Sequence, residues 1–335
     1  MHIAKPYLLF LGDAPDALAA KTAAGVAHWR RDDCLGQLSL PGCQADLGLP
    51  ELSLAEATAQ GAKTLIVGVA NRGGVIGATW REVFLAAIAQ GLDIASGLHQ
   101  RLGAVPGLAE AAASVGRQLF DVRHPQEDFA VGSGAERPGL RLLTVGTDCS
   151  VGKMYTSLAL EAEMQRRGFK ATFRATGQTG IFIAGSGVSV DAVVADFISG
   201  AAEMLTPAND PDHWDIVEGQ GSLFHASFAG VSLGLLHGSR PDALVMCHEP
   251  TRRHMRGLPH YPLPSLEDCI AANEAAAKLT NPKVRTLGLS INTAALGDGE
   301  ARELLQDCSY RLGLPCVDPV RTGVAPLVEA LEHWT

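Results

Sequence analysis

The feature that most constrains the fold is a strand, a glycine-bearing loop and a helix in direct succession. The apolar run LRLLTVG (140–146) leads into GTDCSVGKMYT (146–156), and the helical pattern that follows ends at Gly168. Such a loop presents backbone N–H groups at the positive end of a helix, an arrangement that binds phosphate. Lys153 adds an ammonium group that can reach terminal phosphates. The sequence therefore predicts an α/β sheet with an anion-binding loop after one of its strands.

This loop departs from the common phosphate-loop pattern at two points. Five residues rather than four separate Gly146 from Gly152, and Met154 stands where Ser or Thr usually supplies a hydroxyl ligand for Mg²⁺. A thioether is a poor ligand for a hard cation, and Thr156 points elsewhere on the helix. We expect phosphate binding to be kept, and metal-dependent phosphoryl transfer to be disfavoured.

Alternating buried strands and helices along the chain predict parallel sheets covered on both faces. The segment AVGSGAERPG (130–139) is rich in glycine and small residues and carries Pro138, so we place a domain boundary there. Polar residues follow the strands of the second part, where ligands bind in open α/β sheets. The expected strands lie at 6–13, 62–74, 93–99, 117–125, 140–146, 169–180, 215–222, 242–250, 284–292 and 315–320, and the expected helices at 14–29, 79–91, 153–168 and 189–205.

Composition excludes several classes of protein. The net charge is −9, with 27 Lys and Arg against 36 Asp and Glu, and no basic face recurs, so we expect no nucleic-acid partner. Seven cysteines without a C-x-x-C pair favour a reducing cytosol over a disulfide framework or a zinc site. No apolar run is long enough for a membrane span, and YLLFLG is too short for a signal peptide. We expect a cytoplasmic protein with no membrane contact, and Ala- and Gly-rich helical surfaces that leave room for homo-oligomers.

Three segments resemble dethiobiotin synthetase. GTDCSVGK is similar to the GTDTxVGKT loop of that enzyme, including its extended spacing. FRATGQTG resembles the KPVxTG loop that follows its second strand, with Arg174 where lysine is expected. IVEGQGSL resembles its VEGAGG strand end, which places Glu218 at the acidic position that faces the metal. The three matches occur in the expected order, but Met154 and Arg174 depart from the pattern.

A resemblance over nearly the whole chain is closer. GTDCSVGKM, ATGQTG, VEGQGSL and the loop CHEPTRRHMRG, preceded by a Rossmann-like half, are similar to the D-glutamate N-acetyltransferase family, which was long described as a P-loop family of unknown function. The resemblance implies a Rossmann-like domain over 1–135 and a P-loop domain, similar to dethiobiotin synthetase, over 136–335. It also implies an acyltransferase that moves the acetyl group of acetyl-CoA, its cosubstrate, to the amino group of D-glutamate or a similar acidic amino acid.

Acetyl-CoA carries phosphates that do not react, so the loop can serve it without a hydroxyl ligand for a metal. Glu218 is the first candidate for the general base that acetyl transfer needs, and a Mg²⁺ ligand or a carboxylate that holds Lys153 are its alternatives. Asp148 and Lys153 are further catalytic candidates. Asp148 orients Lys153 or contacts the substrate, with an Asx turn as the alternative. The candidate residues for binding the donor are Gly146, Thr147, Cys149, Ser150, Val151, Gly152, Lys153, Met154 and Tyr155.

Arginines are the candidates for binding the carboxylates of the substrate. Arg174 suits a carboxylate clamp, with an ion pair as the alternative. Arg252 and Arg253 suit carboxylates or the phosphates of CoA, with a solvated basic turn as the alternative. Gln178 and Thr179, from the ATGQTG loop, complete the predicted substrate-binding set.

We predict no bound metal, because the spacing of the histidines at 248, 254 and 260 matches no zinc pattern. Cys149 is either a thiol nucleophile or, as we favour, a small filler in a crowded turn. In the first domain GVANRGG (68–74) lacks the dinucleotide-binding order, so Asn71 and Arg72 carry no cofactor assignment.

Two other functions are kept as alternatives. One is an ATP- and Mg²⁺-dependent phosphoryl-transfer or carboxylate-activating enzyme, which Glu218 favours and Met154 disfavours. The other is a non-catalytic nucleotide-sensing module, which needs fewer polar clusters at strand ends than this chain has.

Overall fold

The computed structural model describes residues 3–69, 74–125, 128–332 and 334, and the chain in it divides into two compact units. Unit 1 consists of Met1–Glu127 and Gly177–Ala192, and unit 2 of Asp128–Thr176 and Val193–Thr335. The division expected from the sequence, at residue 135, places Gly177–Ala192 in the second domain. In the structure this segment belongs to unit 1. The reason is packing, since the helix of this segment lies on the first helix of unit 1.

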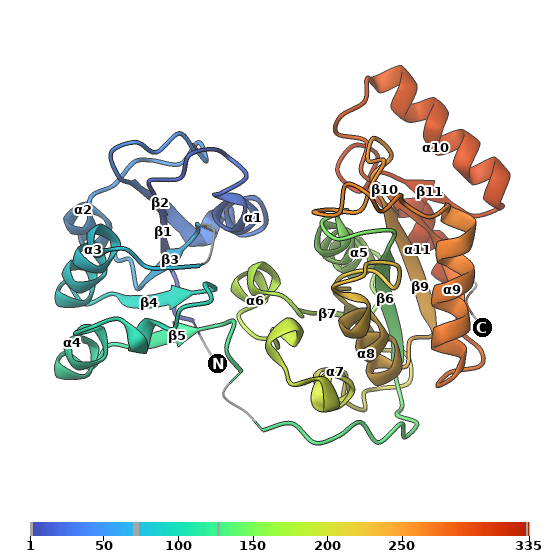
Figure 1. The fold of residues 1–335 in the computed structure, drawn as a ribbon, viewed down its shortest axis with the longest axis horizontal. Coiled ribbons are helices and arrows are strands. Elements are labelled where there is room, and N and C mark those ends of the chain that lie inside the picture. Colours follow the sequence, from blue (N-terminus) through green and yellow to red (C-terminus); the bar gives the residue numbers. More distant parts are fainter. Residues whose placement is uncertain (1–2, 70–73, 126–127, 333, 335) are drawn as a thin grey trace. The chain divides into compact units, whose positions relative to one another are not determined.

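Unit 1 is a five-stranded sheet in the order β2-β1-β3-β4-β5, and all its neighbouring strands are parallel. Helices α1 and α6 lie on one side of the sheet and α2, α3 and α4 on the other (Figure 1). Every residue of β1, β3 and β4 is buried, as expected for central strands covered on both faces. The strands are β1 Tyr7–Gly12, β2 Cys34–Ser39, β3 Thr64–Val67, β4 Asp93–Ser96 and β5 Leu119–Asp121, and the helices are α1 Lys21–Trp29, α2 Leu54–Ala59, α3 Ala78–Ala89, α4 Leu108–Ser114 and α6 Gln178–Ala184.

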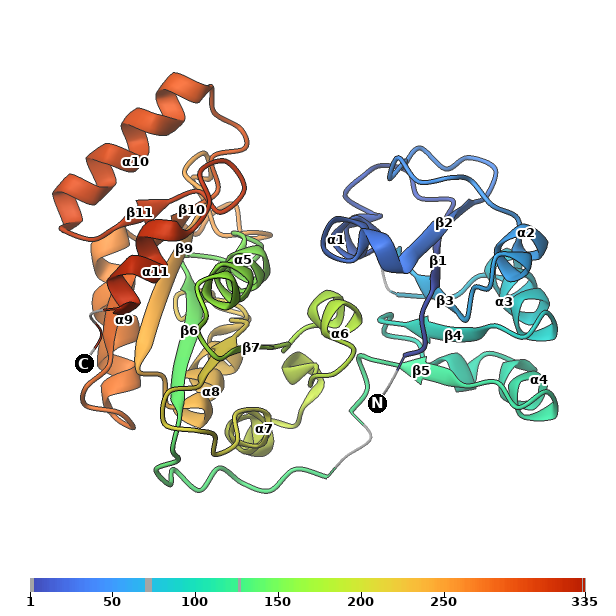
Figure 2. The same ribbon diagram turned by 180° about the vertical axis from the view of Figure 1, so that it is seen from behind.

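Unit 2 is a six-stranded parallel sheet in the order β11-β10-β9-β6-β8-β7. Helices α5 and α11 cover one face and α8 and α9 the other, as Figure 2 shows from behind. Buried apolar residues such as Leu142, Ile216 and Leu327 form its core. The strands are β6 Leu140–Gly146, β7 Ala171–Arg174, β8 Trp214–Val217, β9 Ala243–His248, β10 Arg285–Ile291 and β11 Cys316–Val317, and the helices are α5 Lys153–Arg166, α7 Ile198–Leu205, α8 Ala229–Ser239, α9 Leu266–Lys278, α10 Asp298–Leu312 and α11 Ala325–Glu332.

The two parallel-sheet α/β folds expected from the sequence are confirmed, two local predictions are wrong, and one strand was not predicted. The helix expected over 189–205 begins only at Ile198, and two short 3₁₀ turns precede it, because the chain passes from unit 1 to unit 2 at Ala192. The loop expected after β7 is helix α6. Strand β2 was not foreseen, since Gly36 and Gln37 interrupt its apolar pattern. No helix among the described residues has the length and apolar character that a membrane crossing requires.

Candidate functional site

The phosphate loop joins β6 to α5 as the sequence predicts. Ser150 and Gly152 adopt left-handed backbone angles, with φ of 54° and 101°, and no side chain caps the helix. The first hydrogen bond of helix α5 runs from the Thr156 N–H to the Gly152 carbonyl at 2.9 Å. The N–H groups of Lys153 and Met154 come before it, so they have no acceptor within the helix. These groups and the helix dipole make the N-terminus of α5 suited to an anion.

Lys153 is held beneath this loop. Its side chain is buried, and its ammonium donates to the carbonyls of Asp148 at 2.8 Å and Gly221 at 2.9 Å. Burial lowers the pKa of Lys153, while nearby acidic groups oppose that shift. A Cβ at Gly219 would lie 1.6 Å from the carbonyl of Thr144 on β6, so only glycine lets the 219–221 turn approach this strand so closely. An ammonium has three donors, and two of those of Lys153 are engaged by carbonyls of the described residues.

Glu218 follows β8 and is almost fully buried. Its carboxylate accepts from the Thr176 N–H at 2.9 Å, and the Thr176 hydroxyl donates back to the Glu218 carbonyl at 2.6 Å. The negative charge of Glu218 also helps to keep Lys153 protonated. These contacts favour the interpretation of Glu218 as support for Lys153, and its role as a base stays a prediction.

Asp148 is fully buried and ties the phosphate loop to the loop after β9. One carboxylate oxygen accepts from its neighbour, the Cys149 N–H, at 2.6 Å. The other accepts from the Arg252 guanidinium at 2.7 Å and the Arg256 N–H at 2.8 Å. Arg252 also donates to the Cys149 carbonyl at 2.6 Å, so its guanidinium supports the loop. Arg253 is exposed, and within the described part of the chain its side chain forms no hydrogen bond or ion pair.

Asp148, Cys149 and His225 bring potential metal ligands within 4.8 Å of one another. The ligand atoms of Asp148 and His225 are already engaged. The Asp148 carboxylate accepts hydrogen bonds from the Cys149 and Arg256 N–H groups and from Arg252. The two ring nitrogens of His225 lie 3.2 Å from the Ser227 N–H and 3.0 Å from the Arg256 carbonyl. Burial raises the pKa of the Cys149 thiol, which disfavours both the metal-binding and the nucleophilic thiolate. This cluster does not fit a metal ion.

The hydroxyl of Thr156 does not replace the one that Met154 lacks. It is buried, donates to the Gly152 carbonyl at 3.0 Å and lies 2.8 Å from the Ser290 hydroxyl. The start of α5, Lys153–Thr156, therefore offers no uncommitted Ser or Thr hydroxyl to Mg²⁺.

The predicted substrate residues are divided between the two units. Arg174 donates to buried Asp215 at 2.8 Å, which favours the ion-pair alternative. Gln178 and Thr179 begin α6 in unit 1, where the Thr179 hydroxyl lies 3.4 Å from that of Thr22. Their substrate roles stay predictions.

Two polar residues of the site were not predicted as members of it. The imidazole of His248, at the end of β9, lies 2.9 Å from the Thr147 hydroxyl, and burial lowers its pKa. The Ser222 hydroxyl donates to the Thr147 carbonyl at 3.1 Å. His248 ends a buried strand and Ser222 lies in the turn that follows another, and this position was the available signal.

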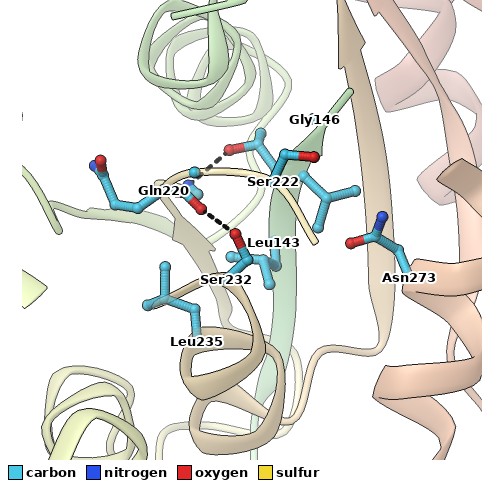
Figure 3. A pocket seen from close by; sticks show the side chains of 11 residues that line it. Leu143, Gly146, Gln220, Ser222, Ser232, Leu235 and Asn273 are labelled. Carbon is cyan, nitrogen blue, oxygen red and sulfur yellow. Dashed lines mark hydrogen bonds between the residues drawn. The ribbon is translucent and has the colours of Figure 1, made fainter. Parts of the chain in front are cut away.

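A small cavity lies between β6 and the 219–222 turn (Figure 3). Its volume is about 10 Å³, enough for one water molecule and no ligand. The Ser232 hydroxyl holds the Gln220 carbonyl at 2.7 Å beside it, and the Thr144 hydroxyl accepts from the Gly219 N–H at 2.9 Å. The cavity is part of the support for the turn that holds Lys153.

A larger pocket of about 180 Å³ is lined in part by the loop. It is formed by the start of α5 and the carboxyl ends of β10 and β11. Its lining includes Val151, Gly152, Tyr155, Asn292, Asp318 and Val320.

The fold and the loop define the class, a two-unit α/β protein with a P-loop domain. Family models also give two domains, with residues 38–125 matching the "DUF1611_N" Rossmann-like domain and residues 128–328 matching the "DUF1611_C" P-loop domain, both described as of unknown function. The second match includes Gly177–Ala192, which belongs to unit 1 in the structure. The chain belongs to this family, which is the D-glutamate N-acetyltransferase family that its sequence resembles.

Relatives match over almost the full length. The chain is 57% identical to a D-glutamate N-acetyltransferase of Tritonibacter scottomollicae, over 98% of this chain and 99% of the relative. It is 53% identical to a D-glutamate N-acetyltransferase of a Pseudoalteromonas species, over 99% of this chain and all of the relative. A crystal structure of a DUF1611 family protein from Anabaena variabilis is 31% identical, with a TM-score of 0.88 over 98% of this chain and 99% of that one.

Proposed function

We propose that this protein transfers the acetyl group of acetyl-CoA to the amino group of D-glutamate. The observation that carries the proposal is 57% identity, over 98% of the chain, to a relative with that name. The site supports it, because the loop offers amides and an ammonium to phosphates but no side-chain hydroxyl to Mg²⁺ at position 154.

In this reaction a C–N bond forms as the thioester C–S bond breaks, and the substrate ammonium gives up two protons. A base takes one of them, and the other goes to the leaving sulfur, so that CoA departs as its thiol. Acetyl-CoA supplies the activated acetyl group. The N–H groups at the start of α5 and the ammonium of Lys153 bind its phosphates. Glu218 is the proposed acceptor of the substrate proton. Arg253, whose guanidinium is exposed, is the proposed partner of a substrate carboxylate.

Phosphoryl transfer from ATP is disfavoured by the buried, committed hydroxyl of Thr156 and by Met154. A nucleotide-sensing module would not need the buried ionic groups Asp148, Lys153 and Glu218 around one loop. We further propose a cytoplasmic location, a homo-oligomeric state and no nucleic-acid partner.

The test is to incubate the purified protein with acetyl-CoA and either D- or L-glutamate, without ATP or metal, and to follow free CoA thiol. We expect thiol release with D-glutamate and little with L-glutamate. An absence of thiol release, with ATP hydrolysis once Mg²⁺ is added, would establish the phosphoryl-transfer alternative instead.

A further inference from the structure

The 180 Å³ pocket beside the phosphate loop is continuous with the anion site. Val151 and Gly152 belong both to the loop and to the lining of the pocket. One ligand can therefore place phosphate against the N–H groups of α5 and another group in the pocket. The volume is below the roughly 300–1,000 Å³ of sites that enclose a whole ligand, so it suits a single ring system.

The charged and hydroxyl groups of the lining are committed to the protein. The Asp318 carboxylate accepts three hydrogen bonds. The donors are the Thr293 N–H at 2.9 Å, the Thr293 hydroxyl at 2.6 Å and the Val320 N–H at 2.9 Å. Thr156 and Ser290 bond to each other at 2.8 Å. Because no uncommitted charge faces the pocket from the described residues, a carboxylate or ammonium there would lose hydration without gaining a partner.

Asn292 is the polar exception. Its side-chain oxygen accepts from the Ala294 N–H at 3.1 Å, while its amide nitrogen has no hydrogen-bond partner among the described residues. The nearby wall is apolar, with Val320 71% exposed at the rim and the ring of Tyr155 at the start of α5. The pocket thus offers one donor, the Asn292 amide nitrogen, beside the apolar surfaces of Val320 and Tyr155. A flat, uncharged ring that carries acceptor nitrogens matches this lining.

We propose that this pocket binds the adenine ring of the acetyl donor, with the Asn292 amide nitrogen donating to a ring nitrogen. The assignment rests on the proposed function, because acetyl-CoA supplies both the phosphates and the base. It makes Asn292 and Val320 specificity determinants that favour a nucleotide-bearing donor over a shorter acetyl thioester.

The binding test compares ADP with pyrophosphate by calorimetry, because the two ligands differ by the adenosine group. We expect wild type to bind ADP at least about tenfold more tightly than pyrophosphate. Asn292→Ser keeps a short acceptor for the Ala294 N–H but cannot reach the pocket, so it lowers ADP affinity about five- to tenfold and leaves pyrophosphate affinity unchanged. Equal affinities for the two ligands in wild type, or an equal loss for both in Asn292→Ser, would overturn the proposal.

Val320→Ala provides a second variant at an exposed position, where folding is not at risk. We expect ADP affinity to fall about threefold in Val320→Ala and to stay unchanged in Val194→Ala, the matched control at a valine that is 67% exposed and does not line the pocket. Equal ADP affinities in the two valine variants would contradict the assignment.

A kinetic test separates this assignment from the proposed function. Wild type and Asn292→Ser are assayed with acetyl-CoA and with S-acetyl-4′-phosphopantetheine, which lacks the adenosine group. We expect wild type to have a higher KM for the truncated donor. Asn292→Ser should raise the KM for acetyl-CoA and leave that for the truncated donor unchanged. Transfer from both donors with equal KM values overturns the adenine site and leaves the function standing. Transfer from neither donor overturns the proposed function. The calorimetric comparison of ADP with pyrophosphate then still decides whether the pocket binds adenine.

Discussion

The carboxyl ends of the strands are built differently in the two units. In unit 2 they carry Asp148, Lys153 and Glu218, which are at most 6% exposed and are held by backbone groups and by Arg252. In unit 1 the last residue of β1 and the residues that follow β3 and β4 are glycines with protein packed against them. A Cβ would lie 2.9 Å from Trp80 at Gly12, 2.3 Å from Ala23 at Gly68 and 2.2 Å from Gln178 at Gly97.

This difference indicates that the strand ends of unit 2 serve ligand binding, whereas those of unit 1 serve packing. Buried charges are expensive unless paired, and such groups concentrate at sites that bind charged ligands. Glycines that admit close neighbours serve the stability of the sheet and its helices. Substitutions at the strand ends of unit 2 should therefore change binding and turnover, whereas those in unit 1 should change local stability. Asn71 and Arg72 lie outside the described residues and do not enter the comparison.

The largest expected effect is that of Glu218→Gln. The amide oxygen can still accept from the Thr176 N–H but cannot take a proton, so kcat should fall about 10²- to 10³-fold with little change in KM. Steady-state kinetics against Glu161→Gln, a glutamate that also accepts a backbone N–H (from Phe173 at 2.7 Å), controls for the loss of charge. A change confined to KM would remove Glu218 as the base and leave it as the support of Lys153.

Lys153→Ala should weaken donor binding by about 10²-fold, or ~2.7 kcal/mol, because it removes the ammonium beneath the loop. The measurement is pyrophosphate and ADP affinity by calorimetry. Lys278→Ala, which removes a surface partner of Glu274, is the matched control. Unchanged affinity for both ligands in Lys153→Ala would contradict the phosphate-loop assignment and, with it, the contrast between the units.

The sequence predicts the phosphate loop well because its structure is local. Strand, glycine turn and helix are adjacent in the chain, and Gly146, Gly152 and Lys153 act through backbone geometry and a single side chain. The strand ends that surround the loop follow from the parallel sheet, since all its strands finish at one edge. This is why Glu218 and the arginines after β9 were found.

Partnerships between distant segments could not be predicted. Arg252 meets Asp148 across 104 residues, and Thr176 meets Glu218 across 42, so which side chains pair is decided by tertiary packing. The same holds for Gly177–Ala192, whose local pattern gives no sign that it belongs to unit 1. Asn292 was overlooked because an asparagine after a strand is also an ordinary turn residue.

Gly97→Ala tests the packing role assigned to unit 1. The added methyl group would lie 2.2 Å from the Gln178 side-chain oxygen and 2.8 Å from its Cβ, so the start of α6 must shift, at about 1–3 kcal/mol. We expect faster hydrogen exchange in Gln178–Ala184 with unchanged ADP affinity. Gly103→Ala, whose Cβ would meet nothing within 4 Å, is the control, and equal exchange in the two variants would refute the packing role.

The smallest effect is expected at the far end of α5, where Glu163 accepts from Arg166 and Arg167 and their hydrogen bonds lower its pKa to about 2. A carboxylate with a depressed pKa stabilises the folded state above its ordinary pKa of 4.5, and this contribution is lost as the pH falls toward 2. Glu163→Gln should therefore lower the free energy of unfolding at pH 7 by less than about 1 kcal/mol, because Arg166 is exposed, and this should appear as a slightly lower urea midpoint. The difference from wild type should shrink as the pH falls through 2 and vanish below it. Glu303→Gln on α10, an exposed position, should show no such pH dependence. A midpoint difference for Glu163→Gln that stays constant from pH 7 to pH 2 would show that packing, and not charge, acts at this end of α5, as it does in unit 1.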